Sequence, residues 1–124
     1  MTQCLAVVER LVSAYNHKDF NTLEALLAPK LDFAHFNRGF EFNDRGKVLE
    51  VIRHFAAELV PDRRMEEAVR VTVSGNIVVR EAYYSGTAAT DIPGFATAGH
   101  FRLKFCSVFQ LDDAGVILEW KDYG

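Results

Sequence analysis

The sequence has little cysteine and no long hydrophobic stretch, and both absences exclude classes of protein. Its 124 residues include only two cysteines, Cys4 and Cys106, which lie far apart and lack the close spacing of metal ligands. We therefore expect two reduced thiols rather than a disulfide or a zinc site. The longest apolar runs are too short to cross a bilayer, and Glu9 and Arg10 interrupt the first helix-like segment, which argues against a secretory signal. These features predict a cytoplasmic protein with no membrane partner.

Positive charge is also scarce. Lys and Arg number 14 against 17 Asp and Glu, a formal net charge of −3, and Arg63-Arg64 is the only basic doublet. No aromatic residues interleave with basic ones as in a strand-binding groove, so we expect no nucleic-acid partner. Hydrophobic residues make up 49% and charged residues 25% of the chain, the balance of an ordinary globular protein. A chain of this length has room for one core, so we expect a single domain over residues 1–124.

The first half of the chain shows helical periodicity. Apolar residues recur at helical spacing over residues 5–15 and predict a first helix. Asp19 is placed to cap a short second helix that runs through Leu27 and stops before Pro29. A third helix is expected to begin after Asp44 and to continue until Pro61.

After the third helix, β-branched and aromatic residues with turn punctuation predict antiparallel strands at 68–73, 77–84, 101–111 and 116–123. Turn residues at 74–76 and 112–115 predict two hairpins. One earlier strand is expected at 31–36, between the second and third helices. The stretch 85–99 is the longest connection, and we expect it to form a loop at the mouth of a site.

Helices first and strands last indicate an α+β fold rather than an alternating arrangement with a parallel sheet. A flat antiparallel sheet of this size would leave its apolar side in water, so we expect it to curl around the helices. The prediction is three helices in the N-terminal half packed on a strongly curved, mostly antiparallel sheet that forms a cone with an internal pocket.

Several segments, in this order and spacing, resemble a known group: Tyr15-Asn16-His17-Lys18-Asp19, Ile92-Pro93-Gly94, Ser107-Val108-Phe109-Gln110-Leu111 and Glu119-Trp120-Lys121-Asp122-Tyr123. They are similar to the nuclear transport factor 2-like superfamily, which includes ketosteroid isomerase, limonene epoxide hydrolase and the SnoaL-like polyketide cyclases. The last two segments resemble limonene epoxide hydrolase most, and the loop around Pro93 resembles the SnoaL group. The resemblance covers nearly the whole chain and implies the cone fold, with no metal and no cofactor.

Asp122 falls where the epoxide hydrolases of this superfamily keep one member of an Asp-Arg-Asp constellation. The other two positions are Ala82 and Tyr84, neither of which can replace an arginine or an aspartate. The resemblance therefore implies a polar pocket group at Asp122 but disfavours epoxide hydrolysis by that mechanism.

The catalytic residues of ketosteroid isomerase are not preserved in this sequence either. The position of its general-base carboxylate is His35, its oxyanion-hole acid falls near Ser107, and its helix-one tyrosine corresponds to Leu11. What remains is the pair His35 and Asp122. We expect the buried carboxylate to hold one tautomer of the imidazole and to raise its basicity, which is the arrangement of a general base. The alternatives are a structural His35 and an Asp122 that pairs with Arg80.

Strand parity assigns the walls of the expected pocket, because odd positions of 101–109 face inward while Arg102 and Lys104 face outward. Ser107 or Tyr84 would donate a hydrogen bond to a developing oxyanion. The catalytic candidates are His35 and Asp122, and the predicted pocket residues are Tyr15, Phe33, Ala82, Tyr84, Phe101, Leu103, Phe105, Ser107 and Trp120. For Tyr15 and for the aromatic set, core packing alone is the alternative.

Three functions fit this sequence. The first is an enzyme that acts on a hydrophobic cyclic or polyketide-like small molecule by cofactor-free acid–base catalysis, as an isomerase, cyclase, dehydratase or hydrolase. The others are a non-catalytic module that binds a hydrophobic ligand and a dimerisation domain. A polar pair inside an apolar cavity is costly unless it is used, which favours the enzyme. The resemblance also implies a homodimer through the convex sheet face, where Val79, Tyr83 and Val108 would point outward.

Overall fold

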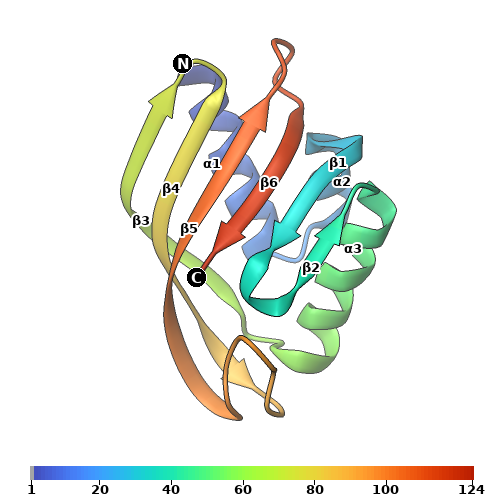
Figure 1. Cartoon of the computed structure of the whole chain (residues 1–124), viewed down its shortest axis with the longest axis vertical. Helices are drawn as coiled ribbons and strands as arrows, with labels where there is room; N and C mark the ends of the chain where they lie inside the picture. The colour runs from blue at the N-terminus through green and yellow to red at the C-terminus, as the bar shows by residue number, and fades with distance from the viewer. Residues whose placement is uncertain (1) are drawn as a thin grey trace.

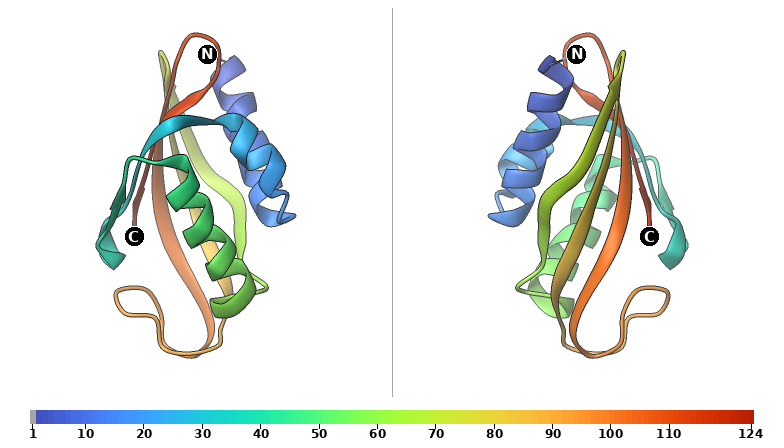
Figure 2. Two further views of the ribbon diagram at one scale, coloured as in Figure 1. Left: turned by 90° about the vertical axis from the view of Figure 1, so that its right-hand side faces the viewer. Right: turned by 90° about the vertical axis from the view of Figure 1, so that its left-hand side faces the viewer.

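Three helices cover one face of a six-stranded mixed sheet in the computed structural model, which describes residues 2–124 (Figure 1). The helices are α1 (Thr2–Asn16), α2 (Phe20–Leu26) and α3 (Arg45–His54). The strands are β1 (Leu27–His35), β2 (Phe40–Phe42), β3 (Arg64–Ser74), β4 (Ile77–Ala88), β5 (Gly99–Leu111) and β6 (Ile117–Tyr123). Seen edge-on, the sheet curves around the helices without closing (Figure 2). The predicted α+β cone is confirmed.

The strand order is β2-β1-β6-β5-β4-β3, and every neighbouring pair is antiparallel except β1 with β6. The mostly antiparallel sheet is therefore confirmed. The parallel pair joins a strand from the first third of the chain to the last strand. It sets Phe33 opposite Trp120 and His35 opposite Asp122. Two residues 87 positions apart in the sequence thus become neighbours, which no local pattern could specify.

The two predicted hairpins are confirmed, but the strands around the long loop extend further than expected. β4 runs to Ala88 and β5 begins at Gly99, so the connection is 89–98 rather than 85–99. The small residues there suggested a loop, yet Gly86 pairs with Phe101 in the ladder. A side chain at Gly86 would collide with Val60, so its small size serves close packing of the strand. β3 likewise begins at Arg64, four residues before its predicted start.

Side-chain caps fix the start of two helices as the sequence predicted. Asp19 accepts a hydrogen bond from the backbone N–H of Thr22 (3.2 Å), and Asp44 accepts one from that of Lys47 (3.2 Å). The second helix ends at Leu26, one residue earlier than expected, because β1 begins at once. Pro29 lies within β1 where its register with β6 is interrupted, so no ladder bond is lost. Within residues 2–124 no helix is long and apolar enough to span a membrane.

The third predicted helix changes character before Pro61. α3 ends at His54, and a π-helical turn, η2 (Phe55–Leu59), continues the chain. The wider turn buries Phe55 and Ala56 against the sheet and closes with a bond from the Val60 N–H to the Phe55 carbonyl (2.8 Å). It therefore carries the aromatic ring of Phe55 to the inner face of the sheet.

The sequence did not predict the short hairpin after β1. A 3₁₀ turn, η1 (Phe36–Arg38), leads through Gly39 into β2, which pairs with β1. Gly39 has a φ of +70°, a left-handed conformation that glycine adopts without strain. This turn places Arg38 close to the inner face of the sheet.

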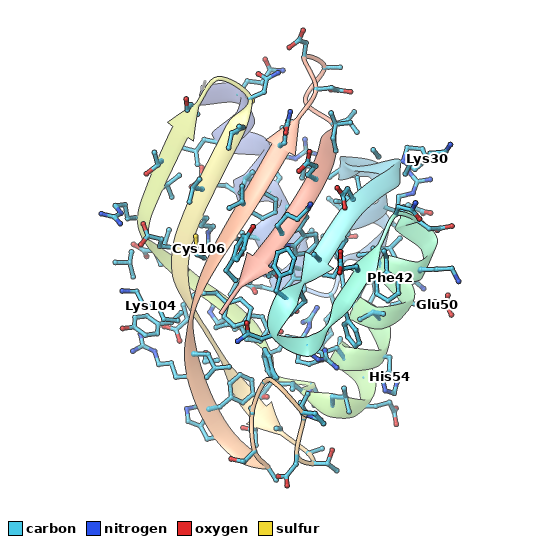
Figure 3. All side chains as sticks on the ribbon, in the orientation of Figure 1. Lys30, Phe42, Glu50, His54, Lys104 and Cys106 are labelled. Atoms are coloured by element: carbon cyan, nitrogen blue, oxygen red, sulfur yellow. The ribbon has the colours of Figure 1, made fainter. Side chains whose placement is uncertain are left out.

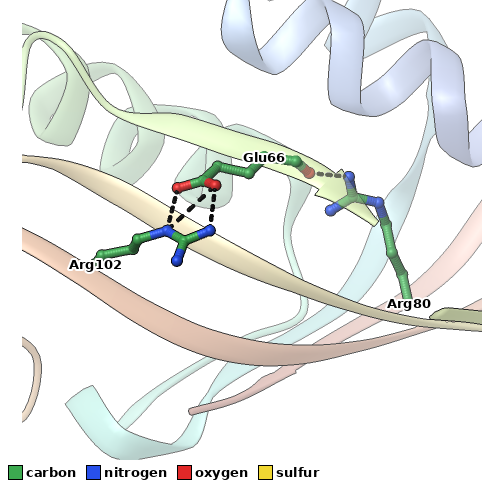
Figure 4. Close-up of polar contacts among 3 residues, drawn as sticks. All are labelled: Glu66, Arg80 and Arg102. Carbon is green, nitrogen blue, oxygen red and sulfur yellow. Dashed lines mark hydrogen bonds and ion pairs between the residues drawn. The ribbon is translucent and has the colours of Figure 1, made fainter. Parts of the chain in front are cut away.

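A polar cluster on the outer side of the sheet ties β3 to β5 across β4 (Figure 4). The Arg102 guanidinium donates to both carboxylate oxygens of Glu66, at 2.9 Å to Oε1 and 3.0 Å to Oε2. From the inner side of the sheet, Arg80 donates to the backbone carbonyl of the same Glu66. The side chains of the ion pair are partly exposed, so the pair contributes little to stability.

Candidate functional site

A small cavity lies between the inner face of the sheet and α3, and one residue of α1 reaches into it. The volume of the cavity is about 50 Å³, which is room for a few water molecules. Most of the lining is aromatic or aliphatic. The polar side chains that line it are Tyr15, His35, Arg38, Arg80, Tyr84, Ser107 and Asp122. An apolar cavity with a few convergent polar groups is the usual form of a small-molecule site.

The structure brings most of the predicted site residues together around this cavity. The lining includes His35, Asp122, Tyr15, Phe33, Ala82, Tyr84, Phe105, Ser107 and Trp120. Phe101 and Leu103 are not part of it. Phe101 lies behind two residues of the lining, with its ring against those of Phe95 (5.2 Å between centroids) and Tyr84 (6.2 Å). Leu103 packs half-buried against the core. Parity gave the correct face of β5 but not the extent of the cavity along it.

Sequence reasoning missed several residues of the lining. Apart from Arg80 and Tyr83, which it discussed in other roles, they are Arg38, Phe40, Val51, Ile52, Phe55, Met65 and Phe95. Arg38 and Phe40 belong to a turn and a strand that the sequence did not predict. Phe95 is the one large aromatic residue in an otherwise small and polar loop, and that contrast was a usable signal.

Asp122 is held by two hydrogen bonds that converge on one of its oxygens. Oδ1 accepts from the Ser107 hydroxyl (2.6 Å) and from the Trp120 indole N–H (3.0 Å). Oδ2 accepts none from the residues that the structure describes. The side chain is 6% exposed, and burial raises the pKa of Asp122 to about 6, although both hydrogen bonds act to lower it. The carboxyl thus titrates close to neutral pH, with one oxygen unused.

His35 lies beside Asp122 in the sheet register but is not bonded to it. Neither Nδ1 nor Nε2 has a hydrogen-bond partner among residues 2–124. Burial, and then the positive charge of Arg38, lower the pKa of His35 to about 4. The expectation that Asp122 orients the imidazole and raises its basicity is therefore wrong. At neutral pH His35 is an uncharged ring with one donor and one acceptor free.

Two tyrosines form the third polar group of the cavity. The hydroxyls of Tyr15 and Tyr84 are 2.6 Å apart and share a hydrogen bond. Burial raises the pKa of both phenols, that of Tyr84 well above 10, so both stay protonated. Since one hydrogen serves the shared bond, the other is available to a ligand oxygen. Leu11, the position that the resemblance matches to the helix-one tyrosine of ketosteroid isomerase, is not a lining residue, and Tyr15, one turn later, is the residue of α1 that lines the cavity.

Two arginines, Arg80 and Arg63, lie at or next to the cavity. Arg80 lines the cavity and donates to the Glu66 carbonyl, so the alternative in which it pairs with Asp122 is wrong. Arg63 is 2% exposed, donates to the Tyr15 carbonyl (2.7 Å) and lies over the Tyr15 ring (4.1 Å). It therefore satisfies a carbonyl in the last turn of α1 and fixes the tyrosine.

The cavity combines a carboxylate that can take up a proton, a hydroxyl pair that can donate to an oxygen, and an uncharged imidazole. These are the components of acid–base chemistry on a carbon next to a carbonyl group. Among the described residues, no three His, Cys, Asp or Glu side chains are grouped as a metal site requires.

The sequence was compared with protein-family models and with curated protein sequences. Residues 8–120 match the family model of the SnoaL-like domain. No curated protein sequence matches the chain.

Solved structures with the same fold cover nearly all of the chain. A proposed polyketide cyclase from Xanthomonas campestris pv. campestris superposes with a TM-score of 0.84 at 20% identity, over 99% of this chain and 90% of that one. IdmH, a proposed polyketide cyclase from Streptomyces antibioticus, gives 0.79 at 22% identity, over 98% and 91%. An LEH-like epoxide hydrolase of M. tuberculosis gives 0.76 at 22% identity, over 98% and 82%. At these identities the similarity shows the fold.

Proposed function

The chain belongs to the SnoaL-like domain family, and from this premise we propose that it is an enzyme for a hydrophobic cyclic or polyketide-like small molecule. Its chemistry is acid–base catalysis by its own side chains, without a cofactor. The observation that carries the proposal is the Asp122 carboxyl, which is buried in an apolar cavity, has a pKa of about 6 and leaves Oδ2 unused. Structural neighbours named as polyketide cyclases and an epoxide hydrolase support small-molecule chemistry in this fold.

Asp122 serves as the general base in this proposal. A carboxylate with a pKa of about 6 is mostly ionised at pH 7 and is far more basic than an exposed one. It removes a proton from a carbon next to a carbonyl: the C–H bond breaks, the proton goes to Oδ2, and the electron pair moves to the carbonyl oxygen. In an isomerisation, the resulting enolate takes that proton back from Asp122 at another carbon. In a ring closure, its carbon attacks a second carbonyl, whose oxygen then takes the proton from Asp122.

The Tyr15–Tyr84 pair stabilises the enolate oxygen. Its spare hydrogen is preorganised by the 2.6 Å bond between the two hydroxyls and lies in a cavity that excludes bulk water. The negative charge of Asp122 acts on both phenols and raises their pKa, which indicates that base and donor lie close together. His35, uncharged at neutral pH, binds the ligand rather than taking the proton.

Access to the cavity requires movement of the loop 89–98. Phe95 covers the cavity with its ring against those of His35 (5.7 Å), Phe55 (5.4 Å) and Phe105 (5.9 Å). The space that remains holds only a few waters, so a cyclic ligand displaces this ring. Return of the loop then excludes water from the reacting atoms.

Deuterium exchange tests the proposed base. The ketone 2-tetralone is incubated in D₂O with the protein, and loss of its α-proton signals is followed by NMR. We expect exchange faster than in buffer for the wild type and for Asp32→Asn, an exposed aspartate outside the cavity, and none above buffer for Asp122→Asn. Equal exchange by Asp122→Asn would remove the assigned role.

A non-catalytic binding role for the same cavity is the second candidate. The close aromatic cover of Phe95 and the unpaired nitrogens of His35 suit a tightly enclosed ligand even without turnover. Binding of 2-tetralone without exchange in the wild type would favour this role over the enzyme.

We also propose that the outer sheet face pairs two copies of the chain, as the superfamily resemblance implies. Val79 and Val108 lie directly opposite each other on β4 and β5, half-buried, with Tyr83 further along β4. Figure 3 labels Lys104 and Cys106, which stand on the same side of β5 as Val108. A second copy would cover the apolar part of this face.

A further inference from the structure

Arg38 places a positive charge against the cavity. The turn η1 directs it toward the inner face of the sheet, where it is half-buried and lines the cavity. Its guanidinium carbon lies 4.4 Å from the centre of the Phe40 ring, 5.1 Å from Phe55 and 6.0 Å from Phe95. These rings hold the cation at a defined place and remove part of its hydration.

No carboxylate of the described residues forms an ion pair with Arg38. Over residues 2–124, the ion pairs of other arginines join Arg70 to Glu81 and Arg102 to Glu66, and Arg38 takes part in none. Burial lowers the pKa of Arg38, and the groups that act against this effect are the hydroxyls of Tyr84 and Tyr15. A partly desolvated cation that faces a cavity without a counter-charge is suited to an anion from outside.

His35 supplies an independent observation at the same place. It is 8% exposed, it lines the cavity, and neither ring nitrogen has a partner among the residues that the structure describes. A buried imidazole with both nitrogens unsatisfied is costly, and a ligand would remove that cost. A carboxylate can accept one bond from the guanidinium and a second from the imidazole N–H.

Asp122 fixes which end of the cavity can take an anion. Its own negative charge repels an anion nearby. Arg38 is held among the rings of Phe40, Phe55 and Phe95, whereas the Asp122 carboxylate is held by Ser107 and Trp120, so different residues surround the two charges. An anionic ligand would direct its charged group to Arg38 and its neutral ring toward Asp122 and the tyrosine pair.

We propose that the ligand of this cavity is a cyclic or aromatic acid, whose carboxylate or similar oxyanion is bound by Arg38 together with His35. The inference deepens the proposed function and rests on it only in assuming that this cavity is the ligand site. It narrows the substrate class from any hydrophobic molecule to one with a fixed negative charge at one end.

Paired probes test the inference. Benzoate and benzamide have the same ring and nearly the same shape, and only benzoate is charged. Their binding is measured by titration calorimetry at pH 7 and low salt, and quenching of Trp120, the one tryptophan of the chain and a lining residue, reports binding in the cavity. We expect benzoate to bind at least tenfold more tightly than benzamide, with added salt weakening only benzoate.

Variants locate the charge that recognises the probe. Arg38→Gln is expected to lose the preference for benzoate and to keep the affinity for benzamide. Arg53→Gln is the matched control, because Arg53 also lies over an aromatic ring, that of Phe20 at 4.9 Å, but is exposed and outside the cavity. It should bind both probes like the wild type. Arg38→Lys keeps the charge and should retain part of the preference.

Three results would overturn the inference: equal binding of both probes by the wild type, no detectable binding of benzoate, or a preference for benzoate that persists in Arg38→Gln. Failure of the proposed function is separately visible. Preference for benzoate without deuterium exchange on 2-tetralone would leave the anion site standing and remove the catalytic role. Deuterium exchange without any preference for benzoate would leave the catalytic role standing and remove the anion site.

Discussion

His35 and Asp122 lie opposite each other on β1 and β6, yet they share no hydrogen bond. The bonds of Asp122 go to Ser107 and Trp120 instead. Burial, and then the charge of Arg38, lowers the pKa of the imidazole to about 4, while burial raises that of the carboxyl to about 6. The basic group of the cavity at neutral pH is therefore the carboxylate.

The rate of deuterium exchange should depend on the ionisation of Asp122. We expect the rate to rise with pH through about 6, as the carboxyl loses its proton. Asp122→Asn should lower it by about 10²- to 10⁴-fold. In Ser107→Ala the midpoint should move to higher pH, because the Ser107 hydroxyl bond lowers the pKa of Asp122. Ser74→Ala, at the β3–β4 turn, is the control, and an equal shift there would contradict this account.

Stability should respond to the same carboxyl. Its pKa rises from 3.8 in the unfolded chain to about 6 in the native protein, so the native state holds the proton more tightly. The stability this gives is complete below about pH 3.8 and is lost as pH rises through 6. The loss is about 3 kcal/mol, since one pKa unit is worth about 1.4 kcal/mol. Asp122→Asn should therefore gain about that much relative to the wild type between pH 4 and 7, measured by urea unfolding.

His35→Gln serves as the contrasting variant for the stability measurement. The native pKa of His35 lies below that of the unfolded chain, so its contribution is present above about pH 6.5 and is lost as pH falls toward 4. The two variants should therefore differ from the wild type with opposite dependence on pH. The same slope in both would contradict the assigned pKa directions.

The tyrosine pair should show strong coupling in a double-mutant cycle. Tyr15→Phe or Tyr84→Phe leaves the remaining hydroxyl buried without its partner, at a cost of about 1–3 kcal/mol. The double variant should be destabilised by less than the sum, with a coupling of about 0.5–3 kcal/mol. Chemical denaturation measures each corner, and Tyr123→Phe on the exposed surface should change little. Additive effects would show that the hydroxyls do not interact.

Gly94 should be required for closure of the loop over the cavity. Its φ is +72°, and a side chain there would collide with the carbonyl oxygen of Asn37. Gly75 has a φ of +58° with open space around it, so Gly75→Ala should cost only the backbone strain, about 1 kcal/mol. Gly94→Ala should cost about 1–3 kcal/mol more and speed hydrogen exchange over 89–98. Equal effects of the two substitutions would argue against a packed loop.

Assembly should depend on the outer face of the sheet. Val108→Asp puts a carboxylate on the proposed interface, where it would be buried without a partner and should convert a dimer to a monomer in analytical ultracentrifugation. Val69→Asp, at a valine of β3 that is 61% exposed, should leave the assembly unchanged. A monomeric wild type would remove the proposed dimer.

Local sequence patterns predicted much of the architecture. Turn residues located both hairpins, and Asp19 and Asp44 marked the helix starts, because these signals act within a few residues. Alternation along β5 gave the inward side of Phe105 and Ser107 correctly. The errors fell where distant packing competes with local preference, as at Gly86, which Val60 packs against, and at Pro29, which lies in a strand.

The sequence by itself determined the α+β class, the two antiparallel hairpins and the inward side of β5, because periodicity and turn chemistry are properties of neighbouring residues. Only the tertiary structure decided the chemistry of the cavity. The pKa of Asp122 depends on burial and on Ser107 and Trp120, and that of His35 on burial and on Arg38. The approach of Tyr84 to Tyr15, 69 positions away in the chain, likewise depends on the packing of α1 against the curved sheet. Such terms depend on distances between residues remote in sequence, and these exist only once the chain has folded.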